Sequence, residues 1–285
     1  METMRDIQRR ISSVENTKKI TRAMKMVASA KLRRAQEMAE QARPFFNKTK
    51  NILADIVRYT RDIQEHPLLV DREGDSHLFL VLGADRGLCG AYNNRVIDTT
   101  EGLIKDNSES SLFIVGKKIK NYFSRRNIEI VSEYVEIMDY PDFEFARKIS
   151  QEVISLFDKE VFDKISLIYT HFNSALNQEV QIMPLLPVSS PEKGDNNRVD
   201  YIYEPQPGKI LDVLLPQYVN NVIYSALLES KASEFGSRMT AMDSATDNAE
   251  EMIEDLTLSY NRARQAAITK EITEIVGGSE ALEEG

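Results

Sequence analysis

Glycine is almost absent from both ends of this 285-residue chain, and that absence most constrains what the chain can fold into. No glycine precedes residue 74, and residues 217–276 contain a single one, Gly236. Glycine weakens a helix interior by about 1 kcal/mol relative to alanine, so long glycine-free stretches favour long helices. We therefore predict one long helix over residues 3–62 and another from residue 210 onward, around a middle of strands and turns.

Both predicted helices repeat apolar or small residues at alternating steps of three and four, the spacing of a left-handed coiled-coil seam. The C-terminal seam comprises Met239, Met242, Thr246, Ala249, Ile253, Leu256, Tyr260, Ala263 and Ala267. The N-terminal seam comprises Met4, Ile7, Ile11, Val14, Lys18, Thr21, Lys25, Ala28, Leu32, Ala35, Ala39 and Ala42, then Phe46, Thr49, Leu53 and Ile56. Because this seam stays in phase beyond Pro44, we expect a kink there rather than a helix end. Each helix is the expected partner of the other.

Opposite charges favour an antiparallel pairing of the two ends. Residues 1–50 hold 13 Lys and Arg against 5 Asp and Glu, whereas residues 210–285 hold 5 against 14. Exposed ion pairs contribute about 0.2 to 1 kcal/mol each, and burial of a Leu, Ile or Met side chain contributes about 1.5 to 3 kcal/mol. The apolar seam should therefore fix the register, while charge sets orientation and solubility.

Composition excludes several classes of function. No apolar run approaches the roughly 20 residues of a membrane span, so we expect no direct membrane insertion and a reducing, cytoplasmic setting. Cys89 is the only cysteine, and His66, His77 and His171 are scattered, so we predict no disulfide, metal or cofactor. No aromatic residue precedes Phe45 to stack on bases, which argues against nucleic acid as the partner of the basic N-terminus.

The middle of the chain alternates short apolar runs with helical segments, which predicts a largely parallel sheet. We expect strands at 77–82, 112–115 and 165–169, crossover helices at 91–105, 117–126 and 143–157, and an exposed, mobile loop at 189–200. The predicted fold class is mixed α/β, a long antiparallel coiled coil of N- and C-terminal helices with a central Rossmann-like α/β domain. The expected segments are 1–70 for the first helix, 75–205 for the α/β head and 206–285 for the second helix.

A glycine-rich segment, residues 83–90, follows the first predicted strand where phosphate-binding loops occur. Its glycine spacing misses G-x-G-x-x-G, and no Lys-Ser/Thr pair follows it as a P-loop requires. We interpret it as a structural turn formed by Gly83, Asp85, Arg86, Gly87 and Gly90. No Ser/His/Asp set or paired carboxylates stand out elsewhere, so we predict no catalytic residue.

Two groups of apolar residues lie off the seams. Met24 and Met26 are expected to face outward, where apolar side chains require a partner. A stripe near the C-terminus comprises Ile268, Ile272, Ile275 and Val276. The stripe is predicted to enter a socket in another protein, and the alternative is a frayed tail ending at Gly277-Gly278.

The most specific motifs lie at the two ends and in the 83–90 segment. They read Ile11-x-Ser13-Val14-x-Asn16-Thr17-x-Lys19-Ile20-Thr21-x-Ala23-Met24-x-Met26-Val27-Ala28, Asp85-Arg86-Gly87-Leu88-Cys89-Gly90, Tyr203-Glu204-Pro205, Met239-x-Ala241-Met242-x-x-Ala245-Thr246-Asp247-Asn248 and Tyr260-Asn261-x-Ala263-Arg264-Gln265-Ala266-x-Ile268-Thr269-x-Glu271-Ile272-Thr273-Glu274-Ile275. With matches from end to end, the chain resembles the gamma-subunit family of F-type (F1Fo) proton-translocating ATP synthases. It lacks the cysteine pair of plastid members, which favours the bacterial type.

The resemblance implies a central rotor shaft and assigns its contacts. Met24 and Met26 resemble the contact with the beta-subunit lever; Arg238, Arg264, Gln265, Thr269 and Glu271 resemble upper-shaft coupling residues; Tyr201 and Glu204 resemble foot residues that meet the c-ring. The implied partners are the alpha and beta subunits of the alpha3beta3 ring, the epsilon subunit and the c-ring of Fo, at the cytoplasmic face of the cell membrane. Nucleotide chemistry is implied to belong to alpha and beta.

Two other classes stay open on the residues alone. A free-standing structural coiled-coil protein with a non-catalytic α/β head has the same seams, but it would not copurify with an alpha/beta ring. A small-molecule enzyme that uses the head predicts that the isolated chain binds a ligand.

Overall fold

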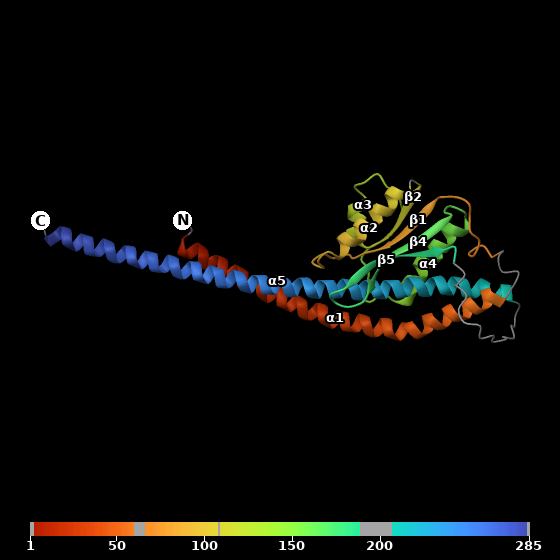
Figure 1. Ribbon diagram of the computed structural model, residues 1–285, viewed down its shortest axis with the longest axis horizontal. Coiled ribbons are helices and arrows are strands. Elements are labelled where there is room, and N and C mark those ends of the chain that lie inside the picture. The colour runs from red at the N-terminus through yellow and green to blue at the C-terminus, as the bar shows by residue number, and fades with distance from the viewer. Residues whose placement is uncertain (1–2, 60–65, 108, 189–206, 284–285) are drawn as a thin grey trace. The chain divides into compact units, whose positions relative to one another are not determined.

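The computed structural model describes residues 3–59, 66–107, 109–188 and 207–283 (Figure 1). Its elements are α1 (Met4–Tyr59), β1 (His77–Leu82), α2 (Tyr92–Asp106), β2 (Ser110–Val115), α3 (Lys117–Phe123), β3 (Ile130–Tyr134), α4 (Phe143–Asp158), β4 (Lys164–Phe172), β5 (Gln178–Leu186) and α5 (Pro207–Glu283). The chain forms two compact units, which we describe separately. Unit 1 comprises residues 1–27 and 239–285, and unit 2 comprises residues 28–238.

The two long helices confirm the prediction from the glycine-free ends. Helix α1 has 56 residues and continues through Pro44, and α5 has 77 residues with Pro216 inside it. Proline removes only one backbone hydrogen bond, so a helix supported by side-chain packing on both sides of the proline can continue through it. The expected kink at Pro44 stays a prediction, and the loop expected at 189–200 lies outside the described residues.

Unit 1 is an antiparallel pair of helical segments held by the predicted seam. On α5, Met242 and Ala249 are buried, and on α1, Ile7 is buried. The hydroxyls of Thr246 and Thr21 meet across the seam at 2.8 Å. Flanking ion pairs follow the same direction: Lys18 binds Glu250 at 2.8 Å, and Lys25 binds Asp243. Because rising numbers on α1 meet falling numbers on α5, the antiparallel orientation is confirmed within this unit.

Unit 2 contains a five-stranded sheet in the order β3-β2-β1-β4-β5. Strands β1 to β4 run parallel, and β5 pairs with β4 in the antiparallel direction. The sequence did not identify the two edge strands. Strand β3 is short and mostly half-buried, and β5 is largely exposed along its middle, with Pro184 in it. Edge strands have only one neighbour and so carry a weaker apolar pattern.

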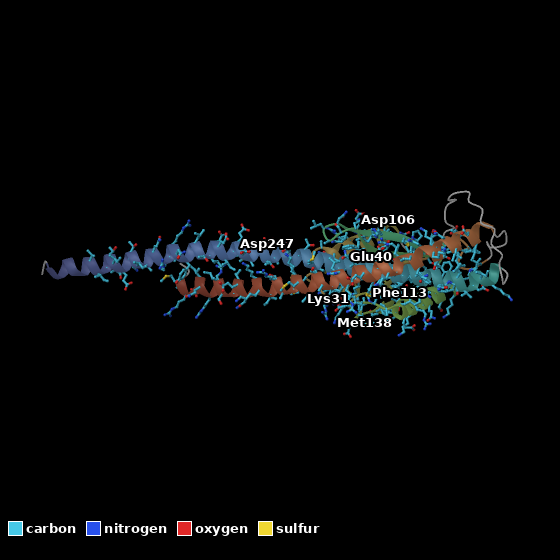
Figure 2. All side chains as sticks on the ribbon, turned by 90° about the horizontal axis from the view of Figure 1, so that it is seen from below. Lys31, Glu40, Asp106, Phe113, Met138 and Asp247 are labelled. Carbon is cyan, nitrogen blue, oxygen red and sulfur yellow. The ribbon has the colours of Figure 1, made fainter. Side chains whose placement is uncertain are left out.

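The core of unit 2 has a layer on each face of the sheet (Figure 1). Leu78, Leu80 and Leu82 of β1 pack toward α4 and the segments of α1 and α5 that belong to this unit. Phe79 and Val81, which alternate with them, pack toward α2 and α3. Strands covered on both faces show continuous apolar runs, which explains why the sequence identified β1. Figure 2 shows Phe113 of β2 within the head and Asp106 and Met138 at its surface.

The seam assignment of unit 1 leads to a test at Ala249, which is buried on α5. Replacing Ala249 with aspartate would place an unpaired charge in the seam, at a cost of about 3 kcal/mol. We expect Ala249→Asp to lower the temperature at which helical circular dichroism begins to fall. Asn248→Asp, an adjacent exposed position, is the matched control and should melt like the unaltered chain. Equal melting of both variants would show that Ala249 does not lie in a packed seam.

Candidate functional site

The segment 83–90, which we call the head loop, joins the carboxyl end of β1 to α2. Gly83 and Gly116 bring the ends of β1 and β2 together. A Cβ on Gly116 would lie 2.6 Å from the carbonyl oxygen of Gly83, and Gly116 has φ of +121°. A Cβ on Gly83 would lie 2.1 Å from Ile119 of α3. Both positions therefore favour glycine, which is consistent with the structural turn expected at residues 83–90.

Asp85 ties the head loop to the neighbouring chain. Its carboxylate accepts the backbone N–H of Lys117 at 2.8 Å and that of Ile137 at 2.5 Å. On the α2 side, the side chain of Asn93 accepts the N–H of Ala84 at 3.1 Å. The N–H of Ala84 in the head loop and the N–H of Lys117 at the start of α3 therefore bind side chains of the protein itself.

Helix α5 covers the place where α/β folds usually bind ligands, the carboxyl ends of the strands at the point where the strand order reverses. That point lies between β1 and β4. Ser230 accepts the N–H of Thr170 at 3.3 Å, Ser233 donates to the carbonyl of Thr170 at 3.1 Å, and Ser237 donates to the carbonyl of Cys89 at 2.8 Å. These hydroxyls recur on one side of α5 and bind β4 and the head loop directly.

Gly236, the single glycine of the C-terminal stretch, marks the closest approach of α5 to the β4–β5 hairpin. A Cβ at Gly236 would lie 3.1 Å from the ring of Phe172 and 3.4 Å from Cα of Ala175. A side chain at position 236 would contact Phe172 and Ala175 and push the hairpin away from α5, which explains why glycine occurs inside this helix.

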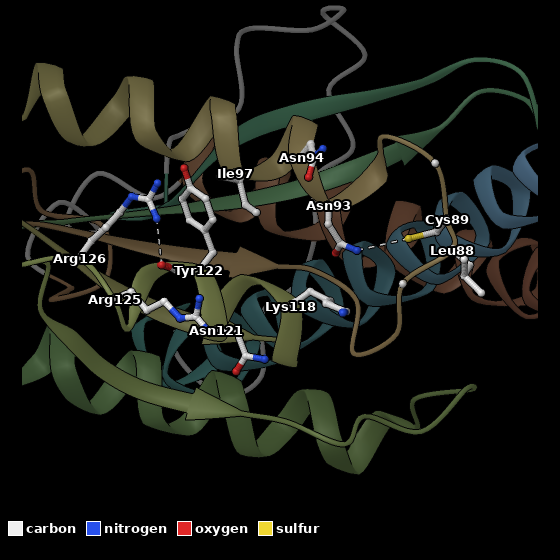
Figure 3. A pocket seen from close by; sticks show the side chains of 12 residues that line it. Leu88, Cys89, Asn93, Asn94, Ile97, Lys118, Asn121, Tyr122, Arg125 and Arg126 are labelled. Atoms are coloured by element: carbon white, nitrogen blue, oxygen red, sulfur yellow. Dashed lines mark hydrogen bonds between the residues drawn. The ribbon is translucent and has the colours of Figure 1, made fainter.

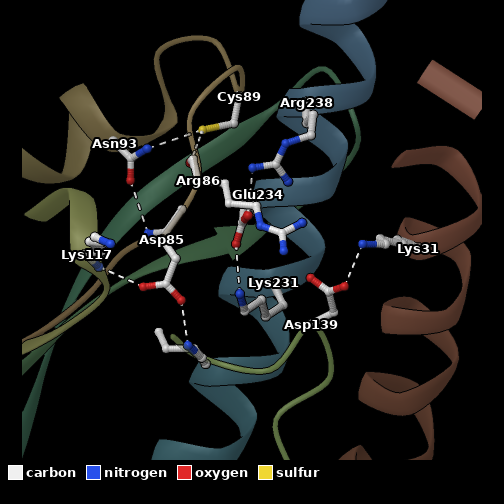
Figure 4. A network of polar contacts seen from close by, with 12 residues as sticks. Lys31, Asp85, Arg86, Cys89, Asn93, Lys117, Asp139, Lys231, Glu234 and Arg238 are labelled. Atoms are coloured by element: carbon white, nitrogen blue, oxygen red, sulfur yellow. Dashed lines mark hydrogen bonds and ion pairs between the residues drawn. The ribbon is translucent and has the colours of Figure 1, made fainter. Parts of the chain in front are cut away.

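A cluster of charges lies where another face of α5 meets the head loop (Figure 4). The carboxylate of Glu234 lies 3.1 Å from Nζ of Lys231 and 2.8 Å from the guanidinium of Arg238. Arg238 also donates to the carbonyl of Gly87, at 3.2 Å from one terminal nitrogen. Nearby, Lys31 of α1 binds Asp139 at 2.6 Å. The cluster therefore joins both long helices to the loops of the head.

Asp139 and Cys89 have pKa values shifted in opposite directions from their ordinary values. Burial acts to raise the pKa of Asp139, but the hydrogen bond and charge of Lys31, with the charges of Lys231 and Arg86, outweigh it and lower the pKa. Burial raises the pKa of the Cys89 thiol, which keeps it protonated and unreactive. Neither group has the environment of a catalytic acid, base or nucleophile.

The head has a hollow of about 540 Å³ between α2 and α3, beside the head loop (Figure 3). Lys118, Arg125 and Arg126 supply positive charge around it. Arg126 is paired with Glu101 at 2.9 Å. The other lining groups are mainly asparagine amides and apolar side chains, with the thiol of Cys89 and the phenol of Tyr122 beside them.

The structure corrects two expectations about outward-facing residues. Arg238, which the resemblance places among the coupling residues, was expected to point toward the surrounding ring rather than toward the N-terminal helix. Its side chain is only 11% exposed and binds Glu234 and Gly87 of the same chain, because the head loop comes close to α5 there. Met24 was expected to face outward but is half-buried, whereas Met26 is 63% exposed. The covered face of α1 therefore extends beyond the seam positions on the side of Met24.

The remaining predicted contact residues lie on the surface of α5 in unit 1. Arg264, Gln265, Thr269 and Glu271 are exposed, as expected. The apolar stripe Ile268, Ile272, Ile275 and Val276 is also exposed. Tyr201 and Glu204 lie outside the described residues.

Sequence patterns did not predict the buried carboxylate of Glu234 or its two cationic partners. A signal was present: Lys231, Glu234 and Arg238 stand three and four residues apart within a stretch otherwise dominated by small and apolar residues. Charges at that spacing share one helix face. Lys31 and Asp139 carried no such signal because 108 residues separate them.

A metal site and a membrane-spanning helix are both absent from the part of the chain that the structure describes. No group of three or more His, Cys, Asp or Glu side chains is arranged to hold a metal ion there. Within the same residues, no helix combines the length and the apolar character that crossing a membrane requires.

Comparison with known proteins gives matches over the whole chain. A family model described as ATP synthase matches residues 3–282. The ATP synthase gamma chain of Halothermothrix orenii is 58% identical over 287 residues, covering 99% of this chain and 100% of that one. The ATP synthase gamma chain of Heliobacterium modesticaldum is 48% identical over 291 residues, with the same coverage.

Solved structures agree with the fold. A chain in the cryo-EM structure of the central stalk and c-ring of Tetrahymena thermophila mitochondrial ATP synthase is 27% identical, with a TM-score of 0.62 over 79% of this chain and 99% of that one. A chain in the Euglena gracilis mitochondrial ATP synthase is 17% identical, with a TM-score of 0.73 over 99% of this chain and 95% of that one, and supports the fold alone.

The close approach of the ends of β1 and β2 leads to a paired test with two glycines. We expect Gly116→Ala to lower the free energy of unfolding by about 2 kcal/mol or more, because the methyl group meets the backbone of Gly83 and the residue has positive φ. Gly102→Ala is the control: Gly102 lies within α2 with no atom near its Cβ position, so alanine should raise stability by about 0.4 to 1 kcal/mol. Urea denaturation followed by circular dichroism measures both. A neutral Gly116→Ala would contradict the close approach.

Proposed function

The chain belongs to the ATP synthase family, among the bacterial F-type gamma subunits, and on that premise we propose that it is the central rotor shaft that couples proton flow through a membrane c-ring to ATP synthesis and hydrolysis. The observation that carries the proposal is the extent of the match. The family model spans residues 3–282, so it includes both long helices and the head. A protein that shared only a coiled coil or only an α/β domain with the family would not match over this range.

The mechanism we propose is mechanical. A partner site changes its nucleotide affinity only if the shaft contacts it differently in different orientations. A two-helix coil is suited to this task because its faces differ. In unit 1, one side of α5 carries exposed Arg264, Gln265 and Glu271, while the seam side is occupied by α1 near Met242 and Ala249. Rotation would present these faces in turn to the beta subunits of the alpha3beta3 ring.

We propose that the chain has no catalytic site of its own and binds no cofactor. Three observations support this. The head loop lacks the P-loop lysine, Asp85 uses its carboxylate on the backbone of Lys117 and Ile137, and Ser230 and Ser233 of α5 occupy the end of β4. Nucleotide would be bound and turned over by the alpha and beta subunits.

The remaining partner assignments follow from family membership. We propose that Met26 and the half-buried Met24 contact a beta-subunit lever, and that the foot meets the epsilon subunit and the c-ring through Tyr201 and Glu204. This would place the subunit peripherally at the cytoplasmic face of the cell membrane. The exposed stripe at Ile268, Ile272, Ile275 and Val276 would enter a socket in the ring, because a helix end with four exposed aliphatic side chains requires cover.

Copurification tests the proposed function. We expect the full-length chain, coexpressed with alpha and beta subunits of a related bacterium, to elute with the alpha3beta3 ring, and the ring to hydrolyse ATP. A free-standing coiled-coil protein would elute alone under the same conditions, and that result would contradict the proposed function.

The exposed residues at the end of α5 provide a sharper test. We expect Arg264→Ala with Gln265→Ala to leave the chain helical but to weaken assembly or ATP-driven proton pumping in reconstituted vesicles. Loss of one member of a polar pair that becomes buried at an interface costs about 2 to 5 kcal/mol, and about 1.4 kcal/mol is already a tenfold change in an equilibrium.

A control matched in chemistry lies on the head. Arg125→Ala with Asn121→Ala also removes an exposed arginine and an exposed amide, and this variant should assemble and pump normally. If the Arg264 and Gln265 variant behaved like this control, those two residues would be solvated surface with no coupling role.

A further inference from the structure

Glu234 is a carboxylate in the interior of unit 2, and its burial needs an explanation. Its side chain is 5% exposed, and those of its two partners, Lys231 and Arg238, are 7% and 11% exposed. Removing charges from water costs several kcal/mol per ion, and pairing recovers that cost only with good geometry. In other proteins, replacing a buried ion pair by apolar residues of similar volume is often neutral or stabilising. The charges therefore serve a purpose other than stability.

Arg238 indicates what that purpose is. Its guanidinium binds Glu234 at 2.8 Å and the carbonyl oxygen of Gly87 at 3.2 and 3.4 Å, through a terminal nitrogen and Nε. Arginine is a long side chain, and a fixed carboxylate one helical turn away restricts it to the conformation that reaches the head loop. Glu234 thus acts on the loop through Arg238.

The same cluster reaches a second loop and the other long helix. Asp139, in the loop between β3 and α4, is bound by Lys31 of α1 at 2.6 Å. Lys231, the second partner of Glu234, lies close enough to Asp139 for its charge to act on that carboxylate. Charges on α1, α5 and two loops of the head are therefore linked around Glu234 (Figure 4).

Hydrogen bonds between charged groups constrain the direction of a contact, which apolar packing does not. The hydrophobic effect depends on buried area and has no direction, so it resists separation of the head from the helices more than it resists slippage of one over the other. Charge-assisted hydrogen bonds have preferred distances and angles and so oppose slippage. A rotor that carries torque from a foot to a shaft needs this second kind of contact.

We propose that Glu234 is a positioning residue that, through Arg238, fastens the head loop to α5, so that the head and the helices of unit 2 turn as one body. The mechanical part of the inference rests on the proposed rotor function. The fastening itself is a property of the chain alone and is tested separately.

Hydrogen exchange on the purified full-length chain tests the fastening. The amides of Ala84 and Tyr92 are hydrogen-bonded to Asn93 and to the carbonyl of Cys89, so they report opening of the head loop. We expect Glu234→Gln, which keeps the shape but removes the charge, to speed their exchange by about tenfold. The pair Glu234→Gln with Arg238→Gln should exchange no faster than Arg238→Gln alone, because Glu234 acts through Arg238.

Two further variants keep this test decisive. Glu254→Gln removes an exposed carboxylate elsewhere on α5 and should leave the exchange of the head loop unchanged. If Glu234→Gln fails to fold, Glu234→Asp keeps the charge but shortens the arm, and it should also speed exchange at Ala84 and Tyr92. Unchanged exchange in the folded Glu234 variants, or equal acceleration throughout unit 2, would overturn the fastening.

Proton pumping tests the mechanical part. In complexes reconstituted into vesicles, we expect Glu234→Gln to reduce the protons pumped per ATP hydrolysed, while Glu254→Gln matches the unaltered chain. Faster exchange with an unchanged pumping ratio would overturn the mechanical role and leave a structural one. If the unaltered chain failed to assemble, the proposed function would be wrong, and the exchange data would still decide the fastening.

Discussion

The structure of unit 2 depends on the burial of α5 between Ala226 and Phe235. The helix is covered on all sides by the sheet, by α1 and by loops of the head, so its backbone bonds are internal and its polar side chains must find partners. Ser230, Ser233 and Glu234 do so on the backbone of β4 and on neighbouring cations. The apolar core holds the sheet against the helices, and these polar contacts add direction to that packing.

This burial also supports the proposal that the α/β head, despite its parallel sheet, binds no nucleotide. In such folds, a ligand lies at the carboxyl ends of the strands, where the chain order reverses. Here a helix of the same chain fills that position. The carboxylate of Asp85 accepts the N–H groups of Lys117 and Ile137, and the side chain of Asn93 accepts the N–H of Ala84. The head loop is a tight glycine turn like that of a binding loop. Here Gly83 and Gly116 let the ends of β1 and β2 pack closely.

Unit 1 follows a simpler principle. Its seam contains small and hydroxyl side chains as well as large apolar ones: Ala249 and the Thr21–Thr246 pair let the two helices pack closely. Most other side chains of α5 in this unit are exposed, among them Arg264 and Ile272. A coil with a broad free surface is suited to contacts that change as it turns, whereas the buried α5 segment of unit 2 is suited to a fixed attachment.

The sequence by itself determined the long helices, their seam, their antiparallel pairing in unit 1 and the central strands, because these features depend on local spacing and on residues buried on both faces. The glycines of residues 83–90 predicted a turn there. The sequence missed the edge strands β3 and β5, which have one neighbour each and weak patterns. Only the tertiary structure decided that Arg238 turns to the head and that Glu234 holds it there. Contacts such as Arg238 with Gly87 join residues 151 positions apart, and no local pattern records which distant backbone a side chain will meet.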